Sequence, residues 1–256
     1  MNPDYFKSRE AVYDQSIQVQ EEYVVLRVDG RAFHTFTKDF NKPFDNKFTY
    51  AMTYVAKKLK EIFAADYAYV QSDEISLGWS PESWWMHQIF SGRVNKINSC
   101  VASTASVLFK DIYTTSHATF DCRTFTLKNL KEYHAYFMWR YRDCYKNAIT
   151  MIAQSVFSHN ELHEKNTNDK IKMLASKGVD VKDFEKRNVY GAMFYSLMVA
   201  NKLSDEEIQQ KFDDFDNQIR VAEKNKDAEL ALSLMQQKKK EFMPFALWWK
   251  ESTQDS

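Results

Sequence analysis

Three acidic residues stand at the ends of two predicted strands. Asp29 closes the apolar run YVVLRVD, and Asp73 and Glu74 separate the apolar runs YAYVQ and ISLGW. Acidic side chains are depleted in strands and are rarely buried without a partner. Carboxylates that lie close together repel one another unless one is protonated or a cation binds between them. The spacing therefore indicates a cation site, and ordinary salt bridges along an exposed sheet edge are the alternative explanation.

Carboxylate oxygens favour Mg²⁺, which often binds substrate phosphates as well. Two such ions about 3.5–4 Å apart stabilise both the attacking and the leaving oxygen of phosphoryl transfer. Gly30 follows Asp29 directly, so the backbone can approach a phosphate closely or offer its carbonyl oxygen. The basic residues that could hold phosphates lie near the first acid or share one face of a predicted helix. They are Arg27, Arg31, Lys42, Arg93 and Lys96.

The hydrophobic pattern predicts the elements that position these residues. They are a strand over 23–30, an amphipathic helix capped by Asp45, a hairpin over 67–79, a helix over 94–108 and a strand over 118–127. This order is typical of a four-stranded antiparallel sheet with two helices on one face. The first and third strands are then central neighbours, so the three acids converge and face away from the helices. The predicted fold class is α+β, a ferredoxin-like polymerase or cyclase palm.

The rest of the chain is predicted to be mainly helical. The pattern predicts helices over 1–22, 129–157 and 171–177, a charged helix opened by Ser204, and a closing strand over 245–250. The segment GAMFYSLMVA (191–200) is a strand or a buried helix, because its periodicity fits both. We predict a palm-like catalytic domain over 1–135 and a helix-rich extension over 136–256, packed on the palm as one compact unit.

The composition indicates a globular protein. Hydrophobic residues make up 44% of the 256 residues, with only 5 Gly and 4 Pro, which favours a helix-rich fold. Lys and Arg number 35, as do Asp and Glu, so the overall charge does not indicate a nucleic-acid partner. Cys100, Cys122 and Cys144 have no CxxC spacing, which favours reduced thiols in a reducing compartment. The polar N-terminus and the shortness of every apolar run predict a cytoplasmic protein with no membrane segment.

A palm with paired acids suits polymerases, nucleotide cyclases and nucleases alike, and the motifs decide among them. RVDGRAFHTFTK (27–38), KPFD (42–45) and QSDE (71–74) closely resemble the tRNA-histidine guanylyltransferase superfamily in order and spacing. GRVNKINSCVAS (92–103) and WRYRDCYKN (139–147) also resemble motifs of this superfamily. TFDCR (119–123) resembles its F-D-G-R strand, with Cys122 in place of the glycine.

The resemblance implies a palm that adds nucleotides to the 5′ end of RNA in the 3′–5′ direction. A 5′-monophosphorylated tRNA is first activated with ATP, and the 3′-hydroxyl of GTP or another NTP then attacks the activated phosphate. The implied partners are tRNA and nucleoside triphosphates, and the implied assembly is a homotetramer.

The resemblance also assigns roles to individual residues. Asp29, Asp73 and Glu74 would be catalytic, and two Mg²⁺ ions would be held by Asp29, Asp73 and the Gly30 carbonyl. The predicted nucleotide-binding residues are Arg27, Asp29, Gly30, Arg31, Ala32, Phe33, His34, Lys42, Asp45, Ser72, Asp73, Arg93 and Lys96. The predicted tRNA-binding residues are Arg123, Arg140, Asn147 and Asn168. Basic and aromatic residues alternate over 121–147, which suits stacking on unpaired bases, although a core helix with a solvated charged face explains the pattern equally.

One departure from the family pattern bears on the substrate. The eukaryotic tRNA-His enzymes carry H-I-N-N where this chain has Tyr145-Lys146-Asn147-Ala148, and the guanylyltransferase-like branch lacks H-I-N-N too. That branch is associated with template-dependent repair of 5′-truncated tRNAs, which is therefore the favoured function. The alternatives are addition of a single G to tRNA-His, a nucleotide cyclase, and a catalytically idle RNA-binding subunit.

Overall fold

The computed structural model describes residues 22–87, 89–114 and 117–195, together with Ser8, Ala11, Ser16 and Ile17. The predicted helix over 1–22 lies largely outside the described residues, and the charged helix at Ser204 and the strand over 245–250 lie wholly outside them. The chain divides into two compact units, Met1–Phe194 and Tyr195–Ser256. The first unit contains the predicted site residues.

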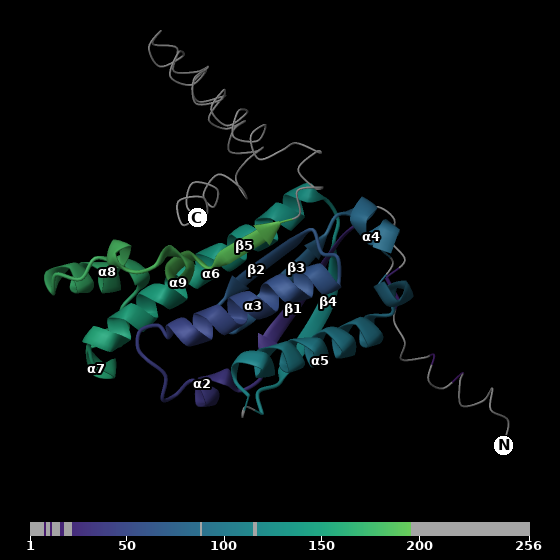
Figure 1. Cartoon of the computed structure of the whole chain (residues 1–256). Helices are drawn as coiled ribbons and strands as arrows, with labels where there is room; N and C mark the ends of the chain where they lie inside the picture. The colour runs from purple at the N-terminus through teal and green to yellow at the C-terminus, as the bar shows by residue number, and fades with distance from the viewer. Residues whose placement is uncertain are drawn as a thin grey trace, which may run out of the picture. The chain divides into compact units, whose positions relative to one another are not determined.

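A five-stranded sheet forms the centre of this unit, with the strand order β4-β1-β3-β2-β5 (Figure 1). The strands are β1 (Tyr23–Gly30), β2 (Tyr67–Gln71), β3 (Glu74–Trp79), β4 (Phe120–Leu127) and β5 (Ala192–Tyr195). The first four strands are antiparallel in the predicted order, with β1 and β3 as neighbours. The predicted number of four strands is corrected to five. The described part of the segment 191–200 forms an edge strand beside β2, which the ambiguous periodicity of that segment did not determine.

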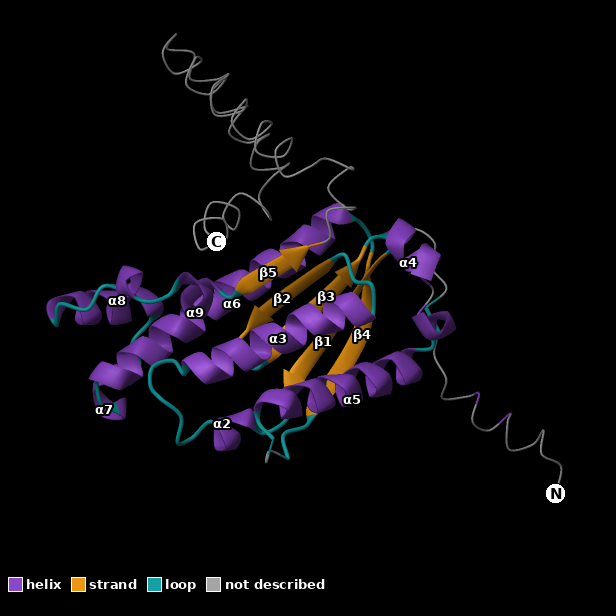
Figure 2. Cartoon of the chain, viewed as in Figure 1, coloured by secondary structure: helices purple, strands orange, loops and turns teal. Residues whose placement is uncertain are grey.

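Two helices, α3 (Asn46–Ile62) and α5 (Val94–Ile112), cover one face of the sheet (Figure 2). The Asp45 side chain accepts a hydrogen bond from the Phe48 amide and so caps α3 as predicted. Alternate residues of each strand point to this face because side chains alternate along a strand. The buried core between the sheet and the two helices includes Val24, Leu26, Val28, Met52, Leu59, Ile97 and Phe109.

The opposite face of the sheet is covered by α6 (Leu130–Val156), which Asn129 caps as predicted. The Tyr136 hydroxyl lies 2.9 Å from the Ser76 hydroxyl, and the Tyr136 ring packs edge-on against Phe125. Both partners belong to the face that points away from α3 and α5. The predicted division between 135 and 136 falls inside α6 and stays a prediction.

Short elements connect these layers. They are α2 (Phe33–Phe36), α4 (Pro81–His87), α7 (His159–Leu162), α8 (Thr167–Ser176), α9 (Lys186–Tyr190) and the 3₁₀ turns Ile89–Gly92 and Val181–Asp183. Within the residues that the structure describes, no helix combines the length and the hydropathy needed to cross a bilayer.

We expect Gly78→Ala to destabilise the fold. A Cβ atom at Gly78 would meet the hydroxyl oxygen of Tyr133 and would lie 2.8 Å from its ring Cζ atom. Because Tyr133 is 2% exposed, its ring cannot move aside into solvent. The overpacking should lower the free energy of unfolding by about 1–3 kcal/mol in a chemical denaturation experiment. Adding Tyr133→Phe to the Gly78→Ala protein removes the hydroxyl that the new Cβ atom would meet. This hydroxyl is buried and has no hydrogen-bond partner among the described residues, so the double variant should recover part of the lost unfolding free energy. An unchanged unfolding midpoint in Gly78→Ala would contradict this packing.

Candidate active site

The acidic residues converge at one end of the sheet. Asp29 in β1 lies opposite Glu74 in β3, and on its other side it lies opposite Asp121 in β4. The amide of Gly30 donates a 3.0 Å hydrogen bond to the carbonyl oxygen of Asp73. The sheet therefore brings the three predicted acids together. It adds Asp121, which the sequence pattern did not single out.

A tight turn presents Asp73 beside Asp29. Ser72 has a φ of 46°, a left-handed conformation that lets β2 turn directly into β3. Burial raises the pKa of Asp73, and the negative charge of Asp29 raises it further, against hydrogen bonds from Ser72 and the backbone. Across the described chain, neither Asp29 nor Asp73 forms an ion pair with a basic side chain. Two neighbouring carboxylates without a positive partner fit a divalent cation.

The donor set fits Mg²⁺ in particular. Among the described residues, no group of three His, Cys, Asp or Glu side chains is arranged to hold a metal ion. Mg²⁺ needs no such group, because it is usually bound through one or two carboxylates together with water and substrate phosphates. Asp29 and Asp73 supply the two carboxylates, and Gly30 can add its backbone carbonyl.

Glu74 is held differently from the other two acids. The guanidinium of Arg140 in α6 donates to both Glu74 oxygens, at 3.1 and 2.9 Å, and Arg27 Nε lies 3.8 Å from one of them. Burial raises the pKa of Glu74, while the charges of Arg140 and Arg27 act against this rise. Its oxygens face arginines, so Glu74 joins the start of β3, directly after Asp73, to α6, and its catalytic role stays a prediction.

Comparison with known proteins identifies the family. The family model described as tRNAHis guanylyltransferase matches residues 3–128. The structure of a bacterial tRNA(His) guanylyltransferase-like protein in complex with ATP is 32% identical to this chain, covers 75% of it and 85% of its own length, and superposes with a TM-score of 0.69. The chain belongs to the tRNAHis guanylyltransferase family. Members of this family are nucleotidyltransferases, and the fold of this chain matches the palm fold of the family.

Other relatives extend the match. The same bacterial protein in complex with GTP superposes with a TM-score of 0.66 at 31% identity, over 75% of this chain and 83% of that one. An uncharacterised protein of Acanthamoeba polyphaga mimivirus is 32% identical over 67% of this chain and 68% of its own length. The tRNA(His) guanylyltransferase of Schizosaccharomyces pombe is 35% identical over 50% of this chain. The match spans only 52% of the length of that yeast enzyme.

The loop after β1 carries most of the predicted nucleotide-binding residues. Ala32 has a φ of 55° and begins α2, while Arg31 and His34 are exposed. Lys42 is also exposed, and its ammonium donates to the carbonyl of Thr37 at 3.0 Å. These side chains lie on the loop that leaves the acidic end of β1, so they can reach a nucleotide bound there.

The side chains of two predicted nucleotide-binding residues, Phe33 and Asp45, make contacts within the fold that leave them little capacity to contact a nucleotide. The Phe33 ring is 2% exposed and packs against other core rings, so only its backbone can face a nucleotide. A Cβ atom at Gly30 would meet this ring, which gives the family's glycine a packing role as well. The Asp45 carboxylate caps α3 and accepts a 3.0 Å hydrogen bond from Asn41, so its oxygens are already engaged.

Arg93 and Lys96 lie at the opposite end of the sheet, which corrects their predicted place in this site. β3 runs away from the acids, and α5 begins after it and carries the chain back to the start of β4. A helix of 19 residues spans roughly 28 Å. The first turn of α5 is therefore separated from Asp29 by about the length of the sheet, and Lys96 lies over the ring of Phe90.

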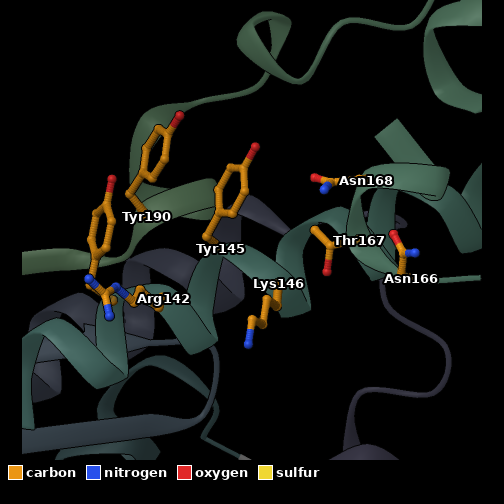
Figure 3. Close-up of a pocket in the computed structure, with 8 residues that line it drawn as sticks. Arg142, Tyr145, Lys146, Asn166, Thr167, Asn168 and Tyr190 are labelled. Atoms are coloured by element: carbon orange, nitrogen blue, oxygen red, sulfur yellow. The ribbon is translucent and has the colours of Figure 1, made fainter. Parts of the chain in front are cut away.

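The predicted tRNA-binding residues divide into two groups. Arg123 and Asn147 are exposed, and Asn168 lines a cavity of about 680 Å³ between α6, α8 and α9 (Figure 3). Arg140 is only 4% exposed, and its guanidinium is shared between Glu74 and Asp143, so its predicted contact with tRNA is corrected to a structural role. Tyr190, which stacks on two tyrosines of this cavity, was missed because no local pattern links residues so far apart in sequence.

Asp73→Asn should stabilise the metal-free protein at neutral pH. A raised carboxyl pKa means that the folded state favours the protonated form, so ionisation of Asp73 lowers stability above that pKa. The asparagine variant should melt at a higher temperature than wild type at neutral pH. The difference should shrink as the pH falls through the raised pKa of folded Asp73 and should vanish below the ordinary value of 3.8, where both states are protonated. Mg²⁺ should raise the melting temperature of the wild type more than that of the variant. An equal rise in both proteins would argue against Asp73 as a ligand.

Arg140→Met should destabilise the protein strongly. The substitution leaves Glu74 buried without its main positive partner, and breaking a buried ion pair typically costs about 3–5 kcal/mol of unfolding free energy. Chemical denaturation measures the loss. In the double variant Arg140→Met/Glu74→Gln the stranded charge is absent, so the combined loss should be smaller than the sum of the two single losses. Strict additivity would show that the two side chains do not interact.

Proposed function

We propose that this protein is a Mg²⁺-dependent enzyme that adds templated nucleotides in the 3′–5′ direction to truncated tRNA 5′ ends. The observation that carries the proposal is the pair of carboxylates Asp29, at the end of β1, and Asp73, on the turn into the neighbouring strand β3, neither of which has a basic partner among the described residues. Membership of a nucleotidyltransferase family supplies the reaction class. An idle RNA-binding subunit would have no use for a carboxylate pair that lowers its stability.

The residues of the site suit a phosphoryl-transfer reaction. Asp29, Asp73 and the Gly30 carbonyl would hold Mg²⁺, which when bound stabilises negative charge on phosphate oxygens. Arg31 and Lys42 are exposed on the segment that follows the acidic end of β1 and would neutralise a triphosphate. The chain would orient the 3′-hydroxyl of an incoming NTP toward the activated 5′ phosphate. A new O3′–P bond then forms while the bond to the AMP leaving group breaks.

The choice of nucleotides follows from the bacterial relative, which was solved with ATP and with GTP. We propose that ATP activates the 5′-monophosphate and that GTP or another NTP is added. The two Mg²⁺ ions and the homotetramer stay predictions from the resemblance. The cytoplasmic location stays a prediction from the polar N-terminus and the short apolar runs.

Repair of 5′-truncated tRNA is favoured over addition of a lone G by the segment Tyr145–Ala148. This segment replaces the H-I-N-N of the tRNA-His enzymes, and Tyr145 and Lys146 line the cavity beside the site. Addition of G to tRNA-His is the second candidate, because the family model carries that description.

The direct test supplies two RNAs to the purified full chain with Mg²⁺, ATP and the four NTPs. One is a 5′-monophosphorylated tRNA that lacks its first nucleotide, and the other is full-length tRNA-His. We expect the truncated RNA to regain the nucleotide that its opposite strand specifies. A lone G added only to tRNA-His would favour the second candidate. Absence of addition to both RNAs by a folded protein would overturn the proposal.

Asp29→Asn should lower the rate of nucleotide addition by about 10³-fold or more, since metal stabilisation of phosphoryl transfer is worth several kcal/mol. Addition is measured by resolving the 5′ end of the product at saturating NTP. Asp183→Asn provides a matched control, because Asp183 is an exposed aspartate outside the acidic site. Equal rates in the Asp29 variant and the control would remove Asp29 from the reaction.

A further inference from the structure

A column of three tyrosine rings stands on one side of the cavity between α6 and α8. Tyr190 stacks on Tyr141 with ring centroids 5.5 Å apart and on Tyr145 with centroids 5.6 Å apart. The interplanar angles are 8° and 6°, so the three rings are nearly parallel. Figure 3 shows Tyr145 between Tyr190 and Asn168. One face of Tyr145 is thus covered by Tyr190, and its other face is turned toward Asn168.

The column is held firmly by the palm. The Tyr69 hydroxyl in β2 donates a 2.8 Å hydrogen bond to the carbonyl oxygen of Tyr190. The Cys144 thiol lies 3.6 Å from the carbonyl oxygen of Val189. A stacking surface that is already ordered loses little conformational freedom when a ligand binds on it.

The charge around the cavity is positive. Arg142 and Lys146 line it, and neither has an acidic partner within ion-pair distance among the described residues. The nearby Asp143 is already paired with Arg140 at 2.7 Å. The Asn168 side chain makes no hydrogen bond within the described chain, so its donors and acceptor are available. Parallel rings, unpaired cations and a free amide suit a planar base that carries a phosphate.

The cavity lies close to the acidic end of the sheet, and none of its lining residues belongs to the loop that carries Arg31 and Lys42. Arg140 donates hydrogen bonds to Glu74, which is the neighbour of Asp73 in sequence. Tyr145 follows Arg140 by five residues on the same helix. Five residues of α-helix advance by about 7.5 Å. A base in the cavity would therefore be near the reacting end without occupying the place of the incoming triphosphate.

We propose that this cavity is a binding slot for one unpaired nucleobase, stacked on the face of Tyr145 that is turned toward Asn168. The Asn168 amide binds the base edge, and Arg142 and Lys146 neutralise the adjoining phosphate. The shared chemistry is a nucleobase with its phosphate, and the source we assign is the RNA strand opposite the truncated 5′ end. This assignment of source rests on the proposed function, whereas the slot itself does not.

The test uses an RNA hairpin whose stem lacks its first 5′ nucleotide. The base left unpaired is replaced by 2-aminopurine, whose fluorescence is quenched when it stacks on an aromatic ring. The full-length protein is titrated into this RNA without Mg²⁺ or ATP, so that no chemistry takes place. A hairpin with the 2-aminopurine paired serves as the RNA control. In a second arm, GTP alone is titrated by calorimetry.

Wild type and Tyr145→Phe should quench the unpaired probe and bind it equally. Tyr145→Ala should abolish the quenching and weaken binding by about 5- to 150-fold, the loss typical for one base–aromatic stack. Asn168→Ala leaves the tyrosine column intact and should weaken binding of the probe, which separates loss of the slot from loss of the fold. Tyr50→Ala, which removes an exposed tyrosine outside the cavity, should bind as wild type does.

The outcomes separate the slot from the proposed function. If the Tyr145→Ala loss appears with GTP alone and not with the hairpin, the slot stands and its source is the free nucleotide. If Tyr145→Ala quenches and binds both ligands as wild type does, while melting normally, the slot is overturned. Quenching that depends on Tyr145 in a protein that adds no nucleotide would retain the slot and reject the repair reaction.

Discussion

The antiparallel register of β1 against β3 determines where every acidic group of the site lies. Asp29 faces Glu74 because Val28 and Ile75, their neighbours along the strands, must both point into the core under α3 and α5. A slip of one residue would exchange the two faces and bury carboxylates in that core. The apolar face of the sheet therefore sets the position of the acids, and the turn through Asp73 follows from the same pairing. The geometry of the site depends on the burial of side chains that take no part in it.

Of the acidic residues at this end of the sheet, some are paired with arginines and others are not. If every acid were paired with an arginine, no charge would remain to attract a cation. If none were paired, their repulsion would strain the fold. The structure pairs Glu74 with Arg140, while Asp29 and Asp73 have no basic partner among the residues it describes. The same ion pair joins α6 to the sheet, and α6 carries Tyr145. This salt bridge therefore links the acidic end of the sheet to the helix that carries Tyr145.

Local signals in the sequence predicted much of this architecture. They did not predict the contacts between elements that are distant in sequence. Side-chain caps and strand alternation depend on neighbouring residues, so the cap at Asp45 and the order of the first four strands were found. The burial of Arg140 and the stacking of Tyr190 depend on where α6 and α9 pack against the sheet. The hydrophobic periodicity of a single segment does not predict this packing. The position of Arg93 at the end of the sheet opposite the acids could have been predicted from the order of the elements. A helix that returns the chain to the acidic end of the sheet must begin at the other end.

The chemistry of the cavity bears on which reaction the site performs. An enzyme that always adds the same nucleotide gains from polar groups fixed around one base. An enzyme that copies a template takes its specificity from base pairing and needs only a surface that holds any base in place. Stacking is tolerant of sequence because every base has a π face. The cavity offers parallel tyrosine rings and the exposed amide of Asn168, with Tyr145 where the tRNA-His enzymes have the first residue of H-I-N-N. Histidine and tyrosine can both stack on a base, but the tyrosine ring is larger and one of its faces is backed by Tyr190, which suits the template-dependent repair proposed above.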